Sequence, residues 1–182
     1  MRAPRLAVSV ILAGLLATIV GAPTGAMRDQ LRNQLLPWCS ALSVHWGPLV
    51  SPQTGEDPLA VAFVNGSSGT CVTKGYAQLQ LVEAKGPALP FRVGHTSQYF
   101  VTLHPRLIVL KSGQVTHEMI AKYRCDTGEA VAVAGLRLVV PVSHQVLRLA
   151  MTKWHRAAYC KGRRGDPGNY VGISPIANRL PL

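Results

Sequence analysis

The sequence QVTHEMIAKYR occupies residues 114–124 and alternates between two sets of side chains. Val115, His117, Met119, Ala121 and Tyr123 share one face of an extended chain, and the residues between them share the other. A period of two residues is typical of a β-strand. This stretch therefore predicts a strand, and it is the longest one that the sequence offers.

Shorter strands are predicted on both sides of this one, separated by turn-forming residues that draw on 17 Gly and 13 Pro. Helical spacing is found only near the N-terminus, at 27–36. Many short strands with Gly and Pro turns predict an all-β, antiparallel β-sandwich, and an open barrel is the alternative. The expected strands are 42–46, 59–65, 76–83, 89–93, 99–103, 107–110, 130–133, 136–140, 146–149 and 170–173.

The N-terminus has the layout of a secretory signal peptide. Arg2 and Arg5 precede an uncharged apolar run at 6–20, and small residues follow up to Ala26. We expect cleavage after Ala26; the alternative is an uncleaved anchor, although the run is short for a full span. The expected organisation is a signal peptide at 1–26, a short helical or linker segment at 27–37, a β-sandwich domain at 38–176 and a C-terminal tail at 177–182. We therefore expect an extracytoplasmic protein, either secreted or associated with the cell envelope.

Four cysteines lie beyond this segment, at Cys39, Cys71, Cys125 and Cys160. Export places them in an oxidising compartment, where they are expected to form two disulfides. Spacing alone does not choose among the three connectivities. If the strand that begins after Cys39 pairs antiparallel with the strand that ends before Cys71, these two cysteines come together. Cys125 ends the long strand and Cys160 lies in a later loop that can fold back to it, so we predict Cys39–Cys71 and Cys125–Cys160.

The second cysteine lies in a recognisable signature. Residues 65–76 read NGSSGTCVTKGY: a strand ends in Asn, and a polar turn, Cys and Gly-Tyr follow. This resembles the exported actinobacterial family known as domain of unknown function 4232, although VTK and Ala77 stand where that family has Thr-Leu-x and Pro. The other three cysteines and VGISP at 171–175 also resemble it, so that the resemblance covers about 38–176. It implies an immunoglobulin-like sandwich in an exported or surface protein, and the family has no assigned activity.

The tripeptide Asn65-Gly66-Ser67 has two interpretations. It fits the acceptor sequence for N-glycosylation, which would place Asn65 on the surface. Asn-Gly between two strands is also a strong turn signal, and we favour the turn.

The chain is strongly basic, with 19 Lys and Arg against 8 Asp and Glu. Loss of the signal peptide removes two Arg and leaves 17 against 8, which favours attraction to anionic surfaces. Five cations gather around Trp154 and Tyr159, where they could hold phosphate or carboxylate groups while the aromatic rings meet a sugar face or a membrane interface. The alternative is a solvated loop tethered by Cys160. The cluster consists of Lys153, Arg156, Lys161, Arg163 and Arg164.

Catalytic patterns are not found in the sequence. No Gly-x-Ser-x-Gly elbow occurs, and no His-x-His pair could offer two metal ligands on one strand face. The adjacent acids Glu56 and Asp57 fall in an expected turn between Gly and Pro, and most other acids fall in expected turns or strand ends, where they would be solvated. His117 and Glu118 point to opposite faces of one strand and cannot chelate together. We therefore expect no enzymatic activity, no cofactor and no metal.

These observations favour an exported, non-enzymatic binding or interaction module at the cell envelope, with the basic cluster as its candidate ligand site. The expected partner is an anionic envelope component or a protein. Nucleic acid is not expected because export removes the chain from it, and a membrane would be contacted only through an uncleaved signal segment. The alternative is a structural or assembly module that recognises a partner protein through a sheet edge or an apolar face. A metal-binding protein or a hydrolase is less favoured.

Overall fold

The computed structural model describes residues 36–53, 55–101, 103–125, 129–161 and 166–181. The expected signal peptide at 1–26, and all but the last two residues of the expected segment at 27–37, lie outside these ranges. Within them the chain forms twelve strands and one 3-10 turn, η1 (Pro167–Asn169). A helix of the length and apolarity needed to cross a membrane is not found in these ranges.

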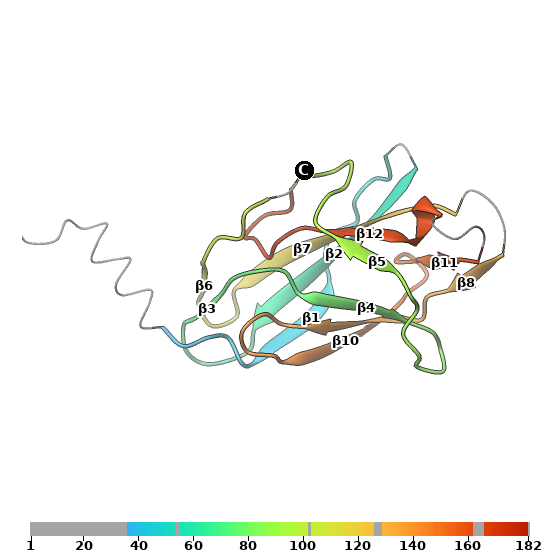
Figure 1. Cartoon of the computed structure of the whole chain (residues 1–182). Helices are drawn as coiled ribbons and strands as arrows, with labels where there is room; N and C mark the ends of the chain where they lie inside the picture. The colour runs from blue at the N-terminus through green and yellow to red at the C-terminus, as the bar shows by residue number, and fades with distance from the viewer. Residues whose placement is uncertain (1–35, 54, 102, 126–128, 162–165, 182) are drawn as a thin grey trace, which may run out of the picture.

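The larger sheet has five strands and forms one layer of the molecule (Figure 1). Its long central strands pair antiparallel over nine residues, from Glu56 opposite Tyr123 to Val64 opposite Val115. The pairing is antiparallel throughout, except that the short edge strand β5 runs parallel to β12. In spatial order the strands are β1 (Leu42–Trp46), β2 (Glu56–Asn65), β7 (Val115–Tyr123), β12 (Tyr170–Ile173) and β5 (Arg92–Gly94).

A second, three-stranded sheet packs against the first and consists of β10 (Val146–Ala150), β9 (Gly135–Val139) and β4 (Gln78–Val82). Aliphatic side chains from both sheets fill the space between them, because every second residue of each strand points inward. The large sheet contributes Val61, Phe63, Ile120 and Ile173, and the small sheet contributes Leu79, Leu81, Leu136, Leu138 and Leu147. The predicted all-β, immunoglobulin-like sandwich is therefore confirmed, with the parallel β5–β12 pair as a departure from a purely antiparallel arrangement.

Two short ribbons lie at opposite ends of the sandwich (Figure 1). One pairs β3 (Cys71–Thr73) with β6 (Ile108–Leu110), and the other pairs β8 (Ala130–Ala132) with β11 (Ala158–Cys160). Each ribbon contains one cysteine of a disulfide, and the pairings are the predicted ones, Cys39–Cys71 and Cys125–Cys160. Their sequence separations of 32 and 35 residues correspond to a stabilisation of roughly 3–4 kcal/mol each in the chain-entropy model. Two disulfides also indicate an oxidising, extracytoplasmic environment.

Some expected elements differ from the structure. The described residues of 99–103 form no strand; instead Phe100 packs on Met119 and Ala121, so that this segment covers the outer face of the large sheet. Glu56 and Asp57 do not lie in a turn but begin β2. The three-residue strands β3 and β11 were not expected.

Both faces of β7 are buried. The face with Thr116, Glu118, Ile120 and Lys122 points into the space between the sheets, although it is the more polar one by composition. The opposite face is covered by the segment around Phe100 and by the C-terminal segment. The large sheet is therefore a middle layer, which explains why a mid-strand acid and a mid-strand amine are buried.

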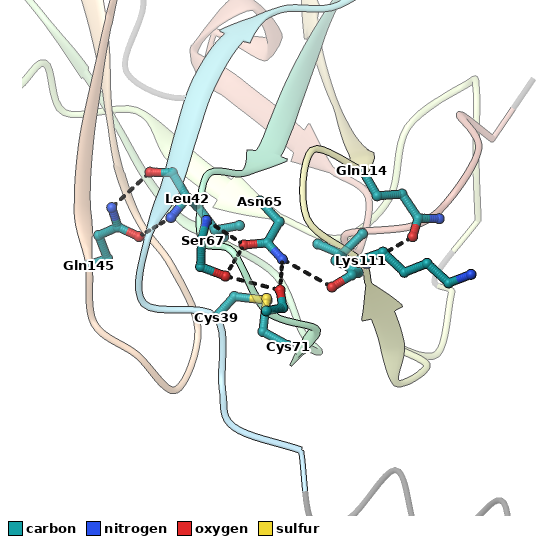
Figure 2. The surroundings of a disulfide bond; sticks show 10 residues. Cys39, Leu42, Asn65, Ser67, Cys71, Lys111, Gln114 and Gln145 are labelled. Carbon is teal, nitrogen blue, oxygen red and sulfur yellow. Dashed lines mark hydrogen bonds between the residues drawn. A yellow bond between two sulfur atoms is a disulfide. The ribbon is translucent and has the colours of Figure 1, made fainter.

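Asn65 organises the turn that leads from β2 to the first disulfide (Figure 2). The residue is 1% exposed, and its Nδ2 donates to the carbonyl oxygens of Gly69 (2.8 Å) and Leu110 (3.0 Å). Its Oδ1 accepts from the backbone N–H and the hydroxyl of Ser67. The side chain thus connects the turn before Cys71 to β6. Both amide hydrogens are used in a buried site, so the glycosylation interpretation is wrong and the turn interpretation is confirmed.

We expect Asn65→Asp to lower the free energy of unfolding by about 2–4 kcal/mol, because it replaces two buried donors by an acceptor that faces two carbonyl oxygens. Ser67→Ala is the matched control and should cost less than about 1 kcal/mol, since it removes a hydroxyl at the edge of the same turn. Urea unfolding of the oxidised proteins measures both values. Equal stabilities of the two variants would contradict this account of the turn.

Candidate functional site

A groove forms where β2 extends past the end of β1. The pairing between these strands stops at Trp46 opposite Val61, so residues 56–60 of β2 have no β1 partner. Pro48 and Pro52 follow β1 and Pro58 lies in β2; proline has no N–H with which to continue a ladder. The segment 154–156 completes the walls of a groove of about 460 Å³. We call it the Trp154 groove; its lining is Pro48, Leu49, Val50, Ser51, Pro52, Asp57, Pro58, Leu59, Ala60, Trp154, His155 and Arg156.

A tight turn between β10 and β11 holds Trp154 in the groove wall. The hydroxyl of Thr152 accepts from the backbone N–H groups of Trp154 (3.2 Å) and His155 (3.1 Å), and it lies 2.9 Å from Nδ1 of His155. The His155 ring stacks on Trp46 with a centroid separation of 4.3 Å, and Trp46 Nε1 donates to the carbonyl oxygen of Ala150. The turn is thereby fixed to β1, and Trp154 remains 68% exposed.

The groove combines positive charge with exposed apolar surface. Arg156 lies in its lining, and the Nζ of Lys153 lies 4.9 Å from the centroid of the Trp154 ring. Asp57 is the acid among the described lining residues, and its Oδ1 lies 3.1 Å from Nε of Arg124 in an ion pair. Leu49 adds an apolar side chain that is 67% exposed. This arrangement suits an anion that also has a flat or apolar portion.

His155 forms part of the groove wall but adds no positive charge to it. Burial lowers the pKa of His155 below its ordinary value, which favours the neutral ring at pH 7. Its Nδ1 is occupied by Thr152, and its ring face by Trp46. The positive charge of the groove therefore comes from the neighbouring Lys and Arg side chains.

The structure separates the basic residues that the sequence places together. Lys153 and Arg156 flank Trp154, whereas Lys161 lies beyond the far end of β11 and is paired with Glu129 at 3.4 Å. Tyr159 is partly buried and packs edge-on against Phe91, away from the groove. The two remaining members of the predicted cluster, Arg163 and Arg164, lie outside the described residues.

The other wall of the groove was missed by sequence reasoning. The sequence GPLVSP at 47–52 places exposed apolar residues between two prolines directly after a strand, and this pattern could have indicated a surface loop with a binding role. Arg124 was also missed, since only the antiparallel pairing of β2 with β7 brings it beside Asp57.

A second groove, of about 570 Å³, lies beside the C-terminal segment. Leu103, Ile108 and Ile176 provide apolar surface, and Arg106 and Arg179 provide positive charge. Val101 is 76% exposed close by in the sequence. Among the described residues, no group of three or more His, Cys, Asp or Glu is arranged to hold a metal ion, in either groove or elsewhere.

Glu56, which was expected in a solvated turn, and Glu118, which was expected in the middle of the long strand, are both buried. Glu56 accepts at Oε2 from the N–H of Gln98, and burial raises the pKa of its carboxyl. Glu118 is 1% exposed between the two sheets and accepts at Oε1 from the N–H of Ala77. Burial raises the pKa of Glu118 to about 8, because that one hydrogen bond offsets only part of the cost of desolvating the carboxylate. Glu118 is therefore mainly protonated at neutral pH and belongs to the core rather than to either groove.

No model of a known protein family matches this chain, and no curated protein was found to be similar to it.

The buried carboxyl gives a prediction about stability and pH. The folded-state pKa of Glu118, about 8, lies above its ordinary value of 4.5, so the folded protein binds this proton more tightly than the unfolded chain. The contribution of Glu118 to stability should therefore be fully present below about pH 4.5, fall as the pH rises toward 8 and level off above it. The fall due to this group should be on the order of a few kcal/mol.

Urea unfolding of the wild type and of Glu118→Gln between pH 5 and pH 9 measures this effect. The amide keeps an oxygen for the Ala77 N–H and cannot ionise, so the difference between the two curves should grow in favour of the variant as the pH rises. The partly exposed Glu83→Gln is the matched control, because it makes the same substitution outside the core. A difference for Glu118→Gln that stayed constant from pH 5 to pH 9 would contradict the assignment.

Proposed function

We propose that the protein is an exported, non-enzymatic β-sandwich that binds an anionic component of the cell envelope in the Trp154 groove. Its signal-peptide-like N-terminus and its two disulfides support a location outside the cytoplasm. The four-cysteine pattern and the signature at 65–76 support a place in the family of domain of unknown function 4232, which has no assigned activity.

The single observation that carries the proposal is an exposed Trp154 on a turn held by Thr152, with Lys153 over its ring and Arg156 in the same groove lining. A turn that is already ordered loses little conformational freedom when a ligand binds to it. The ring offers an apolar face to a sugar, while the two cations can meet phosphate or carboxylate groups along the same ligand. The ligand class that fits best is therefore a glycan or polyol polymer that carries repeated phosphate or carboxylate groups.

The second candidate function is recognition of a partner protein in an assembly. It is favoured by the second groove, whose apolar floor and two arginines suit an acidic, partly apolar protein segment. This function would depend on Arg106 and Arg179 rather than on Trp154, and crosslinking in intact cells would give one dominant partner.

Binding of the folded protein to a teichoic acid, whose phosphates alternate with sugars or polyols, tests the first proposal. We expect Trp154→Ala to weaken binding about tenfold and Arg156→Gln several-fold, because stacking and a charged contact are each worth on the order of 1 kcal/mol. Binding should also weaken with added salt. Isothermal titration at two salt concentrations provides the affinities.

Trp38→Ala and Lys111→Gln are the matched controls and should leave binding unchanged. Trp38 is also exposed but precedes β1, whereas the groove follows the other end of that strand, and Lys111 lies in the exposed turn before β7. Unchanged affinity in both groove variants would rule out this binding mode. A neutral glucan that bound equally well would rule out the electrostatic part.

A further inference from the structure

The two disulfides have different surroundings. Cys39 and Cys71 are 2% and 4% exposed, so that both ends of the first disulfide are sealed in the core. In the second disulfide Cys125 is partly exposed, whereas Cys160 is only 1% exposed. Thiol–disulfide exchange needs access to one sulfur, and Cys125 is the partly exposed cysteine of the second disulfide.

A buried amine lies against the inner sulfur of this second disulfide. Lys122 is 5% exposed, and its Nζ lies 3.9 Å from Sγ of Cys160. The same Nζ donates to the carbonyl oxygen of Tyr123 and lies 5.9 Å from the centroid of the Phe91 ring. Burial lowers the pKa of Lys122 to about 8, which still leaves most of the side chain protonated at neutral pH.

Two acids act electrostatically on the same amine and favour its protonated form, and each also has another partner. Asp57, opposite Lys122 on β2, is exposed and paired with Arg124. Asp166 is buried, and its Oδ1 accepts from the N–H of Gly168. Gly168 packs so closely on Sγ of Cys160 that an added Cβ would lie 2.4 Å from it, so that backbone closes this side of the sulfur. Among Lys122, Asp57 and Asp166, the charged group in contact with Sγ of Cys160 is the ammonium of Lys122.

We propose that Cys125 is a site of thiol–disulfide exchange with an extracytoplasmic dithiol, and that Lys122 assists by stabilising Cys160 as the leaving thiolate. The attacking thiolate forms a bond to Sγ of Cys125, and the bond between the two Sγ atoms breaks. The electron pair of that bond goes to Cys160, whose negative charge forms an ion pair with the ammonium. The second thiol of the reagent then releases Cys125, so that the protein disulfide is reduced by two electrons and the dithiol is oxidised to a disulfide.

Hydrogen bonds keep the cysteines in place after the exchange. The backbone N–H of Cys160 donates to Oδ1 of Asn169 (2.7 Å), and Nδ2 of Asn169 donates to the carbonyl oxygen of Cys160. On its other side β11 pairs with β8. The reduced β11 therefore stays paired with β8 and hydrogen-bonded to Asn169, and the disulfide can form again. This inference concerns the disulfide alone and goes beyond the proposed binding function.

Limited reduction of the folded, oxidised protein with dithiothreitol at pH 7 tests the proposal. Alkylation at successive times, followed by peptide mass spectrometry, gives the rate at which each disulfide opens. We expect Cys125–Cys160 to open at least tenfold faster than Cys39–Cys71. Lys122→Met should slow the opening on the order of tenfold, because the leaving thiolate loses its counter-charge. Lys122→Arg should restore much of the rate, and the exposed Lys111→Met should have no effect.

A monothiol identifies the sulfur that is attacked. With glutathione as the probe, we expect the mixed disulfide on Cys125 of the wild-type protein, and this measurement needs no variant to fold. Glutathione on Cys160, equal opening rates for the two disulfides, or an unchanged rate in folded Lys122→Met would each overturn the proposal.

Discussion

The pairing of β2 with β7 is the constraint on which the rest of the molecule depends. Because the two strands are antiparallel and in register over nine residues, the end of β2 lies beside the start of β7, and the start of β2 beside the end of β7. Asn65 and the turn to Cys71 are thereby placed at one end of the pair, and Cys125 at the other. One disulfide is anchored beside each end, so the two small ribbons that carry Cys71 and Cys160 are held at opposite ends of one long unit.

The sequence was most informative where a strand was long enough to show its period. The alternation at 59–65 and 114–124 predicted the two central strands. The disulfide pairing was predicted from the expected antiparallel pairing of 42–46 with 59–65, which the structure confirms, and from the position of Cys125 at the end of the long strand. The same alternation was misleading at 99–103, where Phe100 covers the large sheet while Val101 is 76% exposed. A pattern of apolar residues does not record whether the backbone is hydrogen-bonded to a neighbouring strand. The Trp154 groove could not be predicted from the sequence either. It results from the unequal lengths of β1 and β2 and from a turn that follows β10 much later in the chain.

The buried polar groups were missed for a related reason. A strand that alternates polar with apolar residues normally turns its polar face to water. In β7 the polar face with Glu118 points between the sheets, and the apolar face with Met119 is covered by a loop. Burial of both faces of a strand requires a sheet that lies in the middle of three layers. Here the third layer consists of irregular segments, which show no hydrophobic periodicity in the sequence. Glu118 also links the layers, because its carboxyl accepts the N–H of Ala77, the residue before β4.

The Trp154 groove and the Cys125–Cys160 disulfide belong to one end of the sandwich, but they are held by different interactions. The turn that presents Trp154 is fixed by Thr152 and by the stacking of His155 on Trp46, a residue of β1. The disulfide joins β11 to the segment after β7, where Asn169 and β8 hold the same strand by hydrogen bonds. Opening the disulfide removes none of the contacts that position the Trp154 ring. Binding in the groove and exchange at Cys125 are therefore separable properties, and a failure of one leaves the physical argument for the other intact.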